Sequence, residues 1–127
     1  SGFEDIYYNI NKNNKDEIIR AAMESIGFLV KDIMEMLDNN NQIISSFITV
    51  SGGGARDSLL QFISDLSGQV IRRPKIRDKT AIGVFRVLCD DYDNTATEEA
   101  DLFNPQLDQI QITKKINLWR KIISTLK

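Results

Sequence analysis

Residues 47–62 constrain this chain most, because they read as a strand, a turn of three glycines and the start of a helix. Residues 43–50 are apolar and β-branched and lack a helical period, which predicts a strand buried on both sides. The glycines Gly52, Gly53 and Gly54 permit positive φ angles and close approach of a ligand to the backbone. Free N–H groups at the helix start make this segment a candidate cradle for a phosphate or a nucleotide. A turn that needs glycine for packing alone is the alternative.

Composition excludes several classes of site. The chain has 127 residues, a net charge of -2 and a hydrophobic fraction of 42%, which suits one globular domain without a broad basic surface. We therefore expect no nucleic acid partner. The sequence contains no histidine, which excludes Ser-His triads and the usual zinc sites. Any chemistry must use carboxylates, backbone groups or a bound metal ion.

Cys89 is the single cysteine, so the chain cannot form an internal disulfide. We expect Cys89 to be a small buried hydrophobe. The sequence has no signal peptide and no apolar run long enough to span a bilayer, so we expect a cytoplasmic chain with no membrane partner. The sequence leaves a homo-oligomer open.

A long amphipathic helix is predicted over residues 15–37, with Asn14 as its N-cap and the asparagines at 39–41 as its end. Residues 1–14 are polar and indicate either a loop or an edge strand. Within the helix, apolar residues recur at steps of three and four, which predicts a single inward face. That face carries Ile19, Met23, Ile26, Val30, Ile33 and Leu37.

Two further elements follow the glycine turn. Residues 58–67 predict a helix that ends at Gly68. Val70 and Ile71 predict a short strand that ends near Pro74. The helix is expected to point Leu59, Phe62, Ile63 and Leu66 inward.

The last third of the chain predicts two more helices. One covers about residues 81–90 and begins at Asp78 or Thr80, and Gly83 inside it indicates close packing against its backbone. Residues 91–107 predict a surface loop, whose acidic residues lack the spacing of an EF-hand loop. Residues 108–127 predict a terminal helix that docks on its own domain.

The alternation of helices and strands predicts an α/β fold. Two clear strands are too few to bury helices on both faces of a sheet. The chain is therefore expected to be part of a larger domain, or to gain a strand from residues 1–14.

Three segments resemble the C-terminal part of the FGGY carbohydrate kinases, in the order and spacing of that family. Residues 19–26, IRAAMESI, are similar to the family's RA-x-x-E-S helix. Residues 50–65 are similar to its GGG turn followed by Q-x-x-A/S-D. Residues 73–83, RPKIRDKTAIG, are similar to R-P-x-x-x-E-x-T-A-L-G. The tail, with the pair Trp119 and Arg120, resembles the glycerol kinase branch of the family.

The resemblance implies an α/β fold that is part of an actin-like (RNase H-like) ATPase domain, with helices packed on a small sheet. It implies that residues 1–127 are the C-terminal portion of the second kinase domain. The implied enzyme transfers the γ-phosphoryl group of ATP, with Mg²⁺, to the hydroxyl of a polyol or sugar. In this family the catalytic aspartate, the polyol ligands and the phosphate-binding loop come from upstream sequence. We therefore predict no catalytic residue and no metal ligand in this chain, and no activity for the chain alone.

The implied nucleotide-binding residues are Gly52, Gly53, Gly54, Asp57 and Ser58, which would form the wall around the adenosine half of ATP. The backbone of Gly53 matches a family glycine that contacts the nucleotide. Asp57 or Ser58 matches a position near the adenine, where a carboxylate accepts from an amino group or a ribose hydroxyl.

Two departures from the family pattern affect this pocket. The turn is one residue shorter than in typical glycerol kinases, and the usual G-A-A is Gly83-Val84-Phe85. Two alternatives stay open: a kinase for a ketose such as xylulose, and a non-catalytic actin-like module that binds other proteins.

Three aspartates have ordinary structural explanations. Asp32 lies beside Lys31 in the first helix, Asp65 lies near a helix end, and Asp78 lies at a helix start. We expect none of them to be the catalytic base.

Overall fold

The computed structural model describes residues 11, 13–39, 46–76, 78–89 and 99–125. Four helices, α1 (Lys15–Asn39), α2 (Asp57–Ser67), α3 (Lys79–Cys89) and α4 (Gln109–Ser124), accompany three strands in this part of the chain. The strands are β1 (Phe47–Thr49), β2 (Val70–Pro74) and β3 (Ala100–Phe103). This is the predicted α/β arrangement of helices on a small sheet. The possible edge strand in residues 1–14 falls almost entirely outside the described residues.

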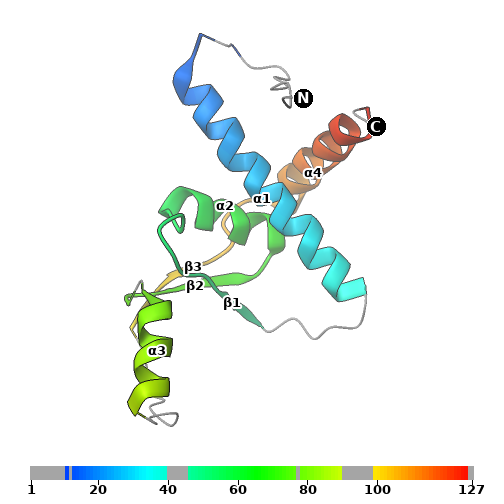
Figure 1. Ribbon diagram of the computed structural model, residues 1–127. Helices are drawn as coiled ribbons and strands as arrows, with labels where there is room; N and C mark the ends of the chain where they lie inside the picture. Colours follow the sequence, from blue (N-terminus) through cyan, green and yellow to red (C-terminus); the bar gives the residue numbers. More distant parts are fainter. Residues whose placement is uncertain (1–10, 12, 40–45, 77, 90–98, 126–127) are drawn as a thin grey trace.

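The sheet has the order β1-β2-β3, with β1 parallel and β3 antiparallel to β2. The prediction of a loop over residues 91–107 was therefore wrong at Ala100–Phe103, where Ile71 of β2 pairs with Phe103 and Pro74 pairs with Ala100. Those four residues become a strand because β2 offers them an open edge, a partner that local sequence does not reveal. Figure 1 shows α2 between the sheet and the long helix α1.

Two clusters of buried side chains make the core. One lies between α2 and the sheet and consists of Leu60, Ile63 and Ile71. The other, which we call the helix seam, joins α1, α2 and α4. The helix seam consists of Phe28, Phe62, Leu66 and Ile112, with Ile116 and Trp119 against it.

The inward face of α1 differs from the prediction. Ile19, Ile26 and Ile33 are 65%, 48% and 56% exposed, whereas Gly27 and Phe28 are buried. Phe28 stacks on Trp119 at a centroid distance of 5.1 Å and meets Phe62 edge-on at 5.5 Å. Aromatic contacts with α2 and α4 therefore select the face that docks. Of the predicted stripe, Val30 packs against the core, and Ile19, Ile26, Ile33 and Leu37 stay exposed.

Three further predictions of burial were wrong. Phe47 of β1 is 43% exposed, because side chains alternate between the two faces of a strand and Ile48 is the one that packs on the core. Cys89 is exposed at the end of α3. A Cβ built on Gly83 meets no heavy atom within 4 Å, so no described residue packs closely there.

The predicted helix caps are confirmed. Asn14 Oδ1 accepts from the amide N–H of Asp16 at 3.1 Å, and Asp78 Oδ1 accepts from that of Ala81 at 2.9 Å. Gly68 ends α2 in the left-handed region, at φ 71°, as its position after the last apolar residue indicated. The terminal helix predicted over 108–127 begins with Asp108 as its N-cap.

Candidate functional site

The glycine turn between β1 and α2 is open to solvent. Gly52 has a φ of +108°, a backbone conformation that residues other than glycine rarely adopt. A Cβ built on Gly52, Gly53 or Gly54 meets nothing within 4 Å. Packing in the described part of the chain therefore does not explain these glycines. This favours the interpretation in which the backbone is left free for a ligand over a turn that needs glycine for packing alone.

The start of α2 borders the same turn. Its N-cap residue is Arg56, whose side chain makes no capping hydrogen bond. The first amides of a helix have no partner inside the helix, and their partial positive charge attracts electron-rich groups. The turn itself is closed by backbone bonds from Ala55 N to Gly52 O at 3.2 Å and from Arg56 N to Gly54 O at 2.8 Å.

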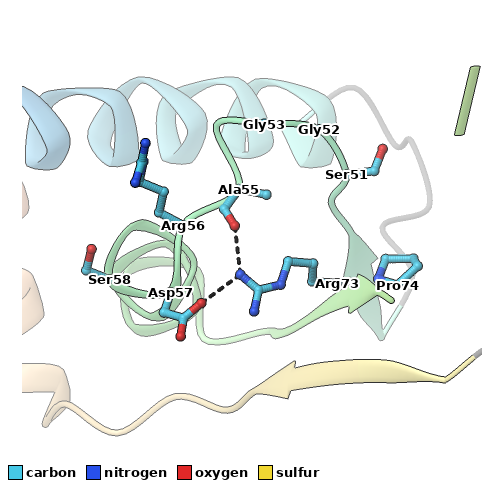
Figure 2. A pocket seen from close by; sticks show the side chains of 9 residues that line it. All are labelled: Ser51, Gly52, Gly53, Ala55, Arg56, Asp57, Ser58, Arg73 and Pro74. Carbon is cyan, nitrogen blue, oxygen red and sulfur yellow. Dashed lines mark hydrogen bonds and ion pairs between the residues drawn. The ribbon is translucent and has the colours of Figure 1, made fainter. Parts of the chain in front are cut away.

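A pocket of about 540 Å³ lies over this turn. Of the predicted nucleotide-binding residues, Gly52, Gly53, Asp57 and Ser58 line it, and Gly54 does not. The other lining residues are Ser51, Ala55, Arg56, Arg73 and Pro74. The last two come from β2, so the pocket lies between the glycine turn and the end of that strand (Figure 2).

Arg73 crosses the floor of this region. Its Nη1 donates to the Ala55 carbonyl oxygen at 2.8 Å and to Asp57 Oδ1 at 2.7 Å. Its Nη2 and Nε donate to Asp101 Oδ2 of β3 at 2.7 Å and 3.2 Å. The guanidinium also lies over the Phe103 ring, 5.3 Å from its centroid. One side chain from β2 thus connects the turn, the start of α2 and β3.

The two predicted polar residues differ in what they leave available. Asp57 has 80% of its side chain exposed and uses Oδ1 for Arg73, while Oδ2 makes no bond to the described part of the chain. Ser58 Oγ donates to Met23 Sδ of α1 at 3.2 Å. Figure 2 shows the Arg73 guanidinium between the Ala55 carbonyl and the Asp57 carboxylate, with Ser58 directed away from it. Asp57 is therefore better placed than Ser58 to accept a hydrogen bond from a molecule in the pocket.

Asp101 is the most perturbed carboxyl near the site. Lys75 Nζ lies 2.6 Å from its Oδ1, and Arg73 holds its Oδ2. These two cations, Lys75 first, lower the pKa of Asp101 below its ordinary value of 3.8. In return, hydrogen bonds to Asp101 and Asp57 raise the pKa of Arg73. The guanidinium therefore carries its positive charge at neutral pH.

The three aspartates considered as possible bases all have structural partners. Asp65 is 5% exposed and accepts from the amide of Gln106 at 2.7 Å and from that of Leu107 at 3.3 Å. Asp32 accepts from Trp119 Nε1 at 3.2 Å, and Asp78 caps α3. Asp65 and Asp32 thus connect elements of the fold, and Asp78 caps a helix.

Among the residues that the structure describes, no three Asp, Glu or Cys side chains gather into a group that could hold a metal ion. In the same residues, no helix combines the length and the apolar composition of a membrane span.

Comparison with known families decides the assignment. Residues 6–89 match the model of the "FGGY family of carbohydrate kinases, C-terminal domain". The chain belongs to this family.

Relatives of the chain are named glycerol kinases. That of Pseudomonas fluorescens is 31% identical over 119 residues, which are 86% of this chain and 24% of the relative. That of Clostridium perfringens is 32% identical over 123 residues, 90% of this chain and 25% of the relative. The chain thus spans about a quarter of the length of the curated relatives it matches.

Solved structures share the fold. Plasmodium falciparum glycerol kinase with ADP superposes with a TM-score of 0.76 at 21% identity, over 93% of this chain and 26% of that one. Xylulose kinase from Lactobacillus acidophilus gives 0.68 at 19% identity, over 93% and 26%. The actin-like arrangement expected for an FGGY kinase is therefore confirmed.

Five residues that line the pocket were not among the predicted site residues: Ser51, Ala55, Arg56, Arg73 and Pro74. The partners of Arg73 lie 16 to 28 positions away along the chain, so no local pattern reports them. The only sequence signal was the R-P pair at the start of the third family segment.

Proposed function

We propose that this chain is the C-terminal portion of the second domain of an ATP-dependent polyol kinase of the glycerol kinase type. The observation that carries the proposal is the open pocket over the glycine turn, on a chain of the FGGY family. The solved relative named above holds ADP, which supports a nucleotide as the ligand of the family. The substrate of the proposed enzyme would be a polyol, with a ketose such as xylulose as the second candidate.

In this proposal the turn is one wall of an adenosine slot. Backbone groups at Gly52 and Gly53 lie along the nucleoside, since no side chain covers them. Asp57 accepts a hydrogen bond from the adenine amino group or a ribose hydroxyl through its second oxygen. A carboxylate repels phosphate, so the phosphates extend away from Asp57, toward parts of the enzyme outside this chain.

The chain itself supplies no catalytic group in this proposal. Phosphoryl transfer requires a positioned hydroxyl, a base or orienting group, and a metal ion. The described residues offer no metal-binding group for the Mg²⁺ that accompanies ATP. We propose that the base and the Mg²⁺ ligands come from other parts of a cytoplasmic enzyme.

The test is a coupled kinase assay on the full-length polypeptide that carries these residues, with glycerol, xylulose and gluconate as acceptors. We expect ATP turnover that depends on glycerol, and none from the 127-residue chain, because one wall of a cleft provides only part of the binding energy. Turnover by the 127-residue chain would contradict the assignment of its role. Absence of turnover with every acceptor would favour a non-catalytic actin-like module.

A further inference from the structure

Apart from the two backbone hydrogen bonds that close it, the glycine turn has few contacts of its own. Its three glycines have no neighbour within 4 Å of a built Cβ, and the side chain of Arg56 does not cap α2. Glycine backbone populates many conformations when nothing restrains it. A ligand that binds such a turn meets the correct geometry only in part of the molecules, and its apparent affinity falls by that fraction.

Arg73 restrains this turn from outside. Its planar guanidinium uses one edge for Asp101 and reaches Ala55 and Asp57 from Nη1. Its side chain is 15% exposed, against 80% for Asp57, so the cation is the inner and better fixed partner of the pair. A rigid fork of this kind can hold several acceptors in one geometry, which a lysine ammonium cannot do as well.

We propose that Arg73 is a positioning residue: by holding the Ala55 carbonyl and the Asp57 carboxylate, it keeps the glycine turn in the geometry that receives a nucleotide. This inference rests on the proposed function. Arg73 acts through the turn and contributes to ATP binding equally in the ground state and the transition state. Its loss therefore raises the KM for ATP and leaves kcat and the KM for the acceptor near their original values.

Lys75 provides a matched control. It bonds to the same aspartate, Asp101, from the same strand region, but it does not line the pocket and does not contact the turn. Removing Lys75 weakens the link between β2 and β3 without releasing Ala55 or Asp57. A purely structural role for Arg73 would make the two substitutions kinetically alike.

The experiment measures steady-state kinetics of the full-length polypeptide as wild type, Arg73→Ala, Arg73→Lys and Lys75→Ala, with thermal unfolding of each. A turn that holds its geometry about a tenth of the time gives about a tenfold higher KM for ATP, which we expect for Arg73→Ala. Arg73→Lys is expected to fall between Arg73→Ala and wild type, and Lys75→Ala to match wild type within about twofold.

Each outcome supports or overturns the positioning role of Arg73. An unchanged KM for ATP in Arg73→Ala overturns the inference, and so does a Lys75→Ala enzyme with the same kinetic defect. If Arg73→Ala does not fold, the KM of Arg73→Lys decides in the same way, with an unchanged value overturning the inference. A wild-type polypeptide that binds no ATP contradicts the proposed function instead, and calorimetric titration with ADP reports that separately.

Discussion

Helices α3 and α4 start from similar sequence patterns and end in different environments. Both are short amphipathic helices with apolar residues at helical spacing. Helix α4 docks on α1, where Trp119 stacks on Phe28 and Arg120 pairs with Glu35. Helix α3 has no buried residue, and its Val87 and Leu88 are 64% and 79% exposed. Figure 1 shows α3 extending away from the sheet and the other helices.

The contrast shows what a helical pattern specifies. It specifies that one face is apolar, and it does not specify what covers that face. In α4, partners within the chain provide an aromatic stack and three charged pairs, Lys115–Glu24, Arg120–Glu35 and Arg120–Asp32. In α3, none of the described residues is buried. The apolar side chains of α3 therefore stay largely exposed in the part of the chain that the structure describes.

The largest effect is expected for Phe28→Ala in the helix seam. The side chain is 8% exposed and contacts two aromatic rings, so truncation should lower the free energy of unfolding by about 3–5 kcal/mol. The matched substitution Phe85→Ala on α3, where the ring is 60% exposed, should change it by less than about 0.5 kcal/mol. Urea unfolding of the 127-residue chain measures both.

Equal costs for Phe28→Ala and Phe85→Ala in the 127-residue chain would break the comparison between α3 and α4. In a full-length polypeptide as long as its relatives, a large cost for Phe85→Ala would instead place a covering segment over α3.

Asp65 tests the docked side of the molecule a second way. Asp65→Ala leaves the amides of Gln106 and Leu107 without their acceptor just before α4, which should cost about 1–3 kcal/mol. Asp65→Asn retains one acceptor oxygen and should cost less. Denaturant unfolding with Trp119 fluorescence follows both, since this tryptophan reports the docking of α4. Equal stability of wild type and Asp65→Ala would show that the loop before α4 does not depend on this carboxylate.

The two helix glycines should respond with opposite signs. A Cβ on Gly27 would lie 2.5 Å from the Phe62 ring, so overpacking by Gly27→Ala should destabilise the protein by about 1–3 kcal/mol. The higher helix propensity of alanine offsets up to about 1 kcal/mol of this cost, so the net change should be destabilising. Gly83→Ala in α3 meets no neighbour and should stabilise by up to about 1 kcal/mol. Thermal unfolding measures both changes. A stabilising Gly27→Ala would contradict the close approach of α1 and α2.

The smallest expected effect is the pH dependence of stability that comes from Asp101 of β3. Its pKa is lower in the folded state than its ordinary value of 3.8, so its contribution to stability is present above pH 4 and is lost as pH falls through the folded pKa. The stability difference between wild type and Asp101→Asn should therefore shrink over the acid range below about pH 5. Urea unfolding across that range measures it. A difference that stays constant with pH would remove Asp101 as the source.

Local signals in the sequence predicted much of the fold, including the glycine turn over which the pocket lies. The caps Asn14, Asp78 and Gly68 and the glycine turn follow from short-range chemistry, and the structure has them where expected. The family segments predicted the actin-like fold. Four of the five proposed binding residues line one pocket.

What the sequence did not reveal depends on partners far along the chain. The face of α1 was ambiguous because the helix carries apolar residues on more than one side, and Trp119 of α4 selects Phe28. Strand β3 exists because β2 offers an edge, and Arg73 is important because its partners converge on it from two other segments. These features are set by tertiary contacts, which local propensity cannot report.

Hydrogen exchange of the full-length polypeptide with and without ADP tests the central claim most directly, because bound ligand slows exchange where it covers or orders the backbone. We predict slower exchange for the amides of residues 51–58 and no change in the helix seam. Unchanged exchange of residues 51–58 at a saturating concentration of ADP would contradict the account.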